Sequence, residues 1–125
     1  MEYECQMIQM DRDKGRPRNS SRCAIARLIR RMLGKEAGFW DVHVGYSGVH
    51  VARNYRARKM GKVVREEDYS GLVRSFRLSE PAIDWLREFD RLKKAERDAL
   101  PLISFTITSV TTKDWFPLQA SQSIV

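Results

Sequence analysis

The chain has 125 residues, of which 42% are hydrophobic and 31% are charged, and its formal net charge is +7. This balance is typical of a single globular domain and argues against a disordered chain. The longest apolar runs are too short to span a bilayer, and the N-terminus from Met1 to Glu4 lacks a signal-peptide core. We therefore expect a cytoplasmic protein in which Cys5 and Cys23 form neither a disulfide framework nor a metal cluster.

The chain begins with a predicted strand over residues 3–10, in which Tyr3, Cys5 and Met7 share one side. Residues 11–19 are rich in glycine, proline and basic side chains, and this composition favours an exposed loop.

A helix is predicted over residues 22–33, with Ser20 or Ser21 as its N-cap and Gly34 at its C-terminus in a left-handed conformation. Apolar residues recur at helical spacing along one side, which we expect to pack on a sheet. The opposite side presents three arginines, Arg27, Arg30 and Arg31.

A β-hairpin is predicted over residues 40–54, because apolar and polar residues alternate on both sides of an expected turn at Ser47 and Gly48. In the register that this turn sets, His43 and His50 are diagonal neighbours on one face of the sheet.

Four more elements complete the predicted order: a loop over 56–68, a strand over 72–78, a helix from 80 to 94 or 99, and a strand over 103–107. Arg74 interrupts the alternation of the first strand, whereas Ser79 with Pro81 is a strong helix start. The order βαββ(β)αβ predicts an α+β fold, a two-layer sandwich with two helices on a mostly antiparallel sheet. Without the interrupted strand, the order is the ferredoxin-like one.

We expect one domain over residues 1–111 and a C-terminal tail over residues 112–125, which either docks on the domain or extends towards a partner. Trp115 and Phe116 in this tail are the candidate contacts to a partner protein, since a few aromatic anchors dominate binding energies. An exposed sheet edge would also allow a homodimer.

The positive charge is concentrated in two stretches. From Arg12 to Arg31 there are eight Lys or Arg and one acid, Asp13, and from Arg53 to Arg65 there are six and no acid. Such a surface attracts polyanions, among which nucleic acid is the commonest large one. The alternative is a solvated polar face without a ligand.

Arginine binds phosphate through a two-pronged guanidinium, and a tyrosine inside the second stretch could stack on a base. We find no catalytic motif, so we expect a non-enzymatic protein that binds nucleic acid or a ribonucleoprotein. The predicted nucleic-acid contacts are Arg16, Arg18, Arg27, Arg30, Arg31, Arg53, Tyr55, Arg56, Arg58, Lys59 and Lys62.

His43 and His50, with Asp41 nearby, are the residues that could hold a metal ion in a small metal-dependent enzyme. The simpler interpretation is that both histidines lie on a half-exposed sheet face. We therefore expect neither a catalytic residue nor a metal or other cofactor. The small metal-dependent enzyme is a third functional hypothesis.

Five segments follow an order found in one group of proteins: residues 23–31, 42–44 and 49–51, the pair Phe89-Asp90, and residues 103–107. With them the chain resembles small uncharacterised proteins of bacteriophages and their bacterial hosts, although Ala24 replaces the proline usual there. The resemblance covers roughly residues 20–108. It implies a phage or mobile-element origin, in the host cytoplasm, and an accessory role. By analogy of size and source, the alternative function is an anti-defence inhibitor, similar to anti-CRISPR proteins, that binds a host protein directly.

Overall fold

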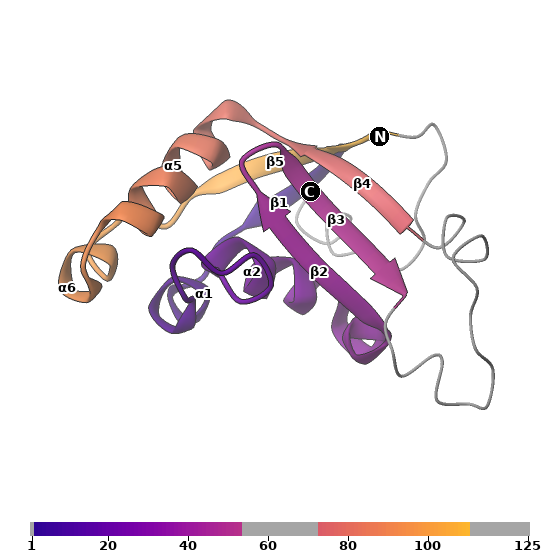
Figure 1. Ribbon diagram of the computed structural model, residues 1–125, viewed down its shortest axis with the longest axis horizontal. Coiled ribbons are helices and arrows are strands. Elements are labelled where there is room, and N and C mark those ends of the chain that lie inside the picture. Colours follow the sequence, from indigo (N-terminus) through magenta and orange to yellow (C-terminus); the bar gives the residue numbers. More distant parts are fainter. Residues whose placement is uncertain (1, 54–72, 111–125) are drawn as a thin grey trace.

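The computed structural model describes residues 2–53 and 73–110. Within them, five strands form one antiparallel sheet in the order β1-β5-β4-β3-β2 (Figure 1). Its strands are β1 (Glu2–Gln6), β2 (Trp40–Gly45), β3 (Gly48–Arg53), β4 (Val73–Leu78) and β5 (Ser104–Ser109). The edges of the sheet are therefore β1 and β2.

The helices in the described residues lie in two of the connections between strands. Between β1 and β2 come α1 (Gln9–Lys14), α2 (Ala24–Leu33) and the 3-10 helix η1 (Gly34–Phe39). Between β4 and β5 come α5 (Glu80–Arg91) and α6 (Lys94–Arg97). The predicted α+β class is confirmed. The topology is not the ferredoxin-like one, because β4 forms and lies between β3 and β5, which adds a strand to the order βαββαβ.

One face of the sheet forms the core with α2 and α5. In β2 the side chains of Val42 and Val44 are buried while those between them are exposed, as expected for a strand covered on one side. From α2 and α5 come large apolar side chains that include Ile25, Leu28 and Phe89, all fully buried. Burial of each such side chain stabilises the fold by about 1.5–3 kcal/mol.

The other face of the sheet is polar, with exposed or half-exposed side chains at the described positions. Its residues include Glu2, Glu4, Asp41, His43, His50, Ser75, Arg77, Thr106 and Thr108.

No helix in the described part of the chain has the length and apolar character that crossing a bilayer requires.

A helix forms where the sequence predicted the end of a strand and a loop. The carboxylate of Asp11 accepts a hydrogen bond from the backbone N–H of Ile8 (3.2 Å) and forms an ion pair with Arg31 (2.9 Å). It therefore satisfies an otherwise unpaired donor at the start of α1 and ties this helix to α2. The first strand is correspondingly shorter than predicted and ends at Gln6.

The predicted N-cap of α2 was also wrong. Its N-cap is Cys23, whose Sγ accepts a hydrogen bond from the backbone N–H of Ala26 (3.5 Å). Upstream, the side-chain oxygen of Asn19 accepts the backbone N–H groups of Ser21 and Arg22 (3.1 Å each). The serines thus belong to a turn built by Asn19, a residue type that favours such turns. Gly34 does end α2 with a positive φ of 57°.

The hairpin turn consists of Tyr46 and Ser47, one residue earlier than predicted. Gly45 pairs with Gly48, and His43 lies directly opposite His50 rather than diagonal to it. This register is constrained partly by β4, because an added Cβ on Gly48 would lie 2.2 Å from the carbonyl oxygen of Phe76. Only glycine fits this position inside the sheet.

The remaining predicted elements in the described residues are confirmed with shifted ends. The helix predicted from residue 80 starts after Ser79, with Pro81 in its first turn, and ends at Arg91 rather than near residue 94 or 99. The last strand extends to Ser109.

Gly48→Ala is expected to lower the free energy of unfolding by about 2–4 kcal/mol, because a methyl clash and a positive φ act together. Gly45→Ala is the matched control: it pairs with Gly48, but nothing lies within 4 Å of its added Cβ. Urea denaturation of both variants measures the difference. Equal losses would contradict the close approach of β3 to β4.

Burial raises the pKa of the Cys5 thiol from 9.0 to about 12, against the opposing charge of Arg31. Above about pH 9 the unfolded chain loses a proton that the folded chain keeps, so stability must fall as the pH rises towards 12. This thiol contributes a slope of at most about 1.4 kcal/mol per pH unit. Urea unfolding across this range should show a shallower slope for Cys5→Ala than for the wild type. Identical slopes would show that Cys5 ionises in the folded protein.

Candidate polyanion-binding site

All the described residues that line one surface depression of about 370 Å³ are basic. We call it the basic pocket. Its lining residues are Lys14, Arg16, Arg22, Arg27 and Arg30. The first two come from the end of α1 and the residues after it, and the other three come from α2 and its entry.

The two walls of the basic pocket are held together by the close contact between the end of α1 and the start of α2. Gly15 is buried there, and an added Cβ would lie 2.6 Å from the backbone nitrogen of Ala24. The backbone N–H of Arg16 donates to the carbonyl oxygen of Arg22 (2.9 Å), which closes the turn between the helices. Side chains far apart in the sequence therefore face one depression.

The charge of the basic pocket is not neutralised internally. Within residues 2–53 and 73–110, none of its five side chains forms an ion pair with a carboxylate. The Nε of Arg27 is buried and has no hydrogen-bond partner there. The pKa of Arg30 is lowered, first by burial and then by the charge of Arg22. Like charges are thus crowded together in a partly desolvated place.

An anion would relieve both of these costs. Phosphate oxygens accept charge-assisted hydrogen bonds from guanidinium and ammonium groups, and arginine can bind them with two donors at once. The basic pocket is therefore chemically suited to a ligand with several phosphate groups.

The structure brings together three of the arginines predicted as nucleic-acid contacts, Arg16, Arg27 and Arg30. Lys14 and Arg22 join them, although the sequence prediction did not select them. The signal that could have found them was their place in the same basic stretch, but only the helical form of α1 puts Lys14 beside α2.

Two other predicted contacts have partners inside the protein. One terminal nitrogen of Arg31 donates to the carbonyl oxygen of Gln6 (2.7 Å) and to the buried carboxylate of Asp11 (2.9 Å). Arg18 donates its guanidinium to the carbonyl oxygen of Asp90 and its backbone N–H to the carboxylate (2.7 Å). We therefore leave both arginines out of the site.

The remaining predicted contacts lie outside the described residues. They are Tyr55, Arg56, Arg58, Lys59 and Lys62, and in the tail Trp115 and Phe116. Arg53 ends β3, but its side chain is also outside the described part of the structure.

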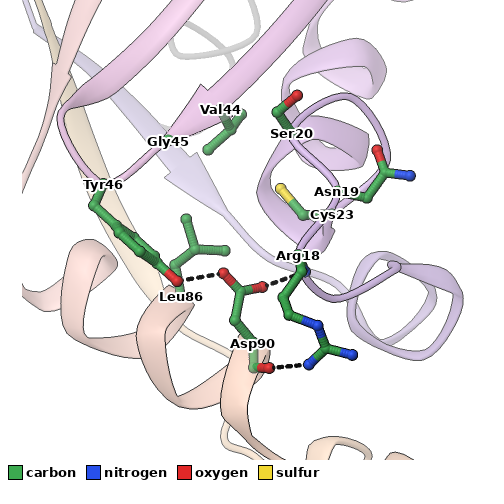
Figure 2. A pocket seen from close by; sticks show the side chains of 9 residues that line it. All are labelled: Arg18, Asn19, Ser20, Cys23, Val44, Gly45, Tyr46, Leu86 and Asp90. Atoms are coloured by element: carbon green, nitrogen blue, oxygen red, sulfur yellow. Dashed lines mark hydrogen bonds between the residues drawn. The ribbon is translucent and has the colours of Figure 1, made fainter.

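A second hollow, of about 250 Å³, lies between α5, the hairpin turn and the entry to α2 (Figure 2). Here the hydroxyl of Tyr46 donates to the Asp90 carboxylate (2.6 Å), which raises the pKa of Tyr46. The guanidinium of Arg87 lies 5.3 Å from the centre of the Tyr46 ring. The backbone N–H of Arg18 donates to the same carboxylate, so Asp90 links the hairpin turn, α5 and the entry to α2.

Comparisons of the chain with protein-family models, with curated proteins and with solved structures found no match. The resemblance to phage accessory proteins therefore stays a prediction. The function has to be argued from the geometry of the basic pocket.

If the basic pocket binds phosphate groups, inorganic triphosphate will stabilise the folded protein, because it binds the folded state alone. We expect a melting temperature several degrees above that in sodium chloride of equal ionic strength. The gain amounts to about 2.7 kcal/mol when the ligand exceeds its Kd by about 100-fold. The triple variant Lys14→Gln/Arg16→Gln/Arg22→Gln should lose this difference. An equal response of both proteins would exclude the basic pocket as the anion site.

Proposed function

We propose that this protein is a non-enzymatic nucleic-acid-binding protein that holds the phosphate backbone in the basic pocket. The observation that supports it is the gathering of five Lys and Arg side chains around one depression, to which the described part of the chain adds no carboxylate. Neutralising bound phosphates releases counterions from the nucleic acid, and this release supplies much of the affinity of such proteins.

The composition of the basic pocket favours binding over catalysis. Among the described residues, its lining contains no histidine, carboxylate, thiol or hydroxyl group, which are the side chains that most often act as general base or nucleophile. Five cationic groups also exceed what a single phosphate group neutralises, which favours a ligand with phosphates in series.

We expect little preference for base sequence from this site. Lys and Arg contacts to phosphate position a protein on nucleic acid but do not read its bases. Neither an aromatic ring nor an amide side chain of the described residues lines the basic pocket, so these residues provide no platform for stacking or adenine recognition. The alternative of an inhibitor that binds a host protein stays a prediction, since its anchors Trp115 and Phe116 lie outside the described residues.

The proposal is tested by the salt dependence of binding to a labelled single-stranded oligonucleotide, measured by fluorescence anisotropy. About five phosphate contacts predict a slope of log K against log salt of about −3 to −4. The variant Lys14→Gln/Arg16→Gln/Arg22→Gln should bind more weakly, and its slope should be smaller by about 2.

The matched control is Lys35→Gln/Arg77→Gln/Lys93→Gln, which removes the same charge from exposed side chains outside the basic pocket. It should keep most of the wild-type affinity and slope. Equal losses in the two triple variants would mean that net charge alone drives binding. An affinity independent of salt would contradict the proposal altogether.

A further inference from the structure

Two histidines lie side by side on the polar face of the sheet. His43 of β2 and His50 of β3 are direct partners in the antiparallel register, and both are exposed. Directly opposite residues on one face have Cβ atoms about 4.5–5.5 Å apart. Two imidazole rings at this spacing can turn their nitrogens towards a common point.

That spacing suits a metal ion such as Zn²⁺. Its bonds to imidazole nitrogen are about 2.0–2.1 Å long, so two nitrogens of a tetrahedral site are roughly 3.4 Å apart. Opposite histidines can reach this separation by side-chain rotation, without a change in the backbone. A diagonal pair, as the sequence predicted, would start from Cα atoms about 7–8 Å apart.

A neighbouring strand orients one of the two rings. Ser75 of β4 lies opposite His50 in the register, and its Oγ is 2.9 Å from Nδ1 of His50. Metal-binding histidines usually donate their second ring nitrogen to such a partner, which fixes the tautomer and the ring orientation. With Nδ1 bound to Ser75, Nε2 of His50 is the nitrogen left for a ligand.

The surroundings leave room for an ion. The next positions along both strands on this face are Gly45 and Gly48, so neither β2 nor β3 places a side chain beside the imidazoles at that end. Asp41 lies two residues before His43 on the same face. It does not complete a cluster, since the described residues contain no group of three or more metal-ligating side chains.

We propose that His43 and His50 form a site for a divalent transition-metal ion of the Zn²⁺ type, with water in the remaining coordination positions. Ser75 is the positioning residue of this site. With two protein ligands the ion is exchangeable and its affinity is modest. The site lies on the sheet face and uses none of the residues of the basic pocket, so this proposal does not depend on nucleic-acid binding.

The test is isothermal titration calorimetry of the untagged full chain with zinc chloride. We expect one ion per chain, and no binding of Mg²⁺, which prefers oxygen ligands. His43→Gln and His50→Gln should each abolish binding. Ser75→Ala should weaken it by about tenfold or more. Thr106→Ala, on the same face but in β5, is the matched control and should leave the affinity unchanged.

Wild-type binding weaker than about 1 mM would overturn the proposal. So would binding that survives both histidine substitutions, because the ion would then be held elsewhere in the chain. An unchanged affinity in Ser75→Ala would overturn the positioning role assigned to Ser75.

Discussion

One buried carboxylate joins the N-terminal elements of this protein. Asp11 is 3% exposed, and it accepts hydrogen bonds from the backbone of Ile8 and from the guanidinium of Arg31. The same guanidinium nitrogen donates to the carbonyl oxygen of Gln6 at the end of β1. The end of β1, α1 and α2 therefore meet at a single point. Because Lys14 is the last residue of α1, this junction fixes one wall of the basic pocket against the other.

Clustered charge in a sequence overstates the charge that is free to bind a ligand. Arg18 and Arg31 belong to the same basic stretch as Arg16, Arg27 and Arg30, yet they bind backbone carbonyls and carboxylates within the fold. The guanidinium group suits both tasks, since its several donors satisfy carbonyl groups as readily as phosphate oxygens. Arg16, Arg27 and Arg30, which form no ion pair with a carboxylate in the described residues, are the ones that the fold gathers into one depression. Carboxylates and carbonyl groups within the fold bind some of these arginines, and the arginines that they leave over form the proposed binding surface.

Periodicity was sufficient to predict the α+β class, α2, α5 and most of the described strands, because each buries one regular apolar side. β4 forms as well, although Arg74 interrupts its apolar side. It was not sufficient for α1, whose stability depends on contacts between Asp11 and Arg31, twenty positions further along the chain. The turn register failed for a similar reason, since the fit of Gly48 depends on the carbonyl oxygen of Phe76 in another strand. The basic pocket was predicted in part, as a charge cluster, but its inclusion of Lys14 follows from tertiary structure alone.

The central claim, that the basic pocket receives phosphate groups, is tested most directly by NMR of the arginine side chains. Arg27 and Arg30 line the basic pocket, whereas the guanidinium of Arg31 binds Gln6 and Asp11 within the fold, so their side-chain resonances distinguish an anion bound in the basic pocket from one bound elsewhere. On titration with a short oligonucleotide, the account predicts that the Nε–H signals of Arg27 and Arg30 shift most, while that of Arg31 stays in place. Shifts confined to the polar sheet face around His43, or a saturating complex that leaves Arg27 unchanged, would contradict it.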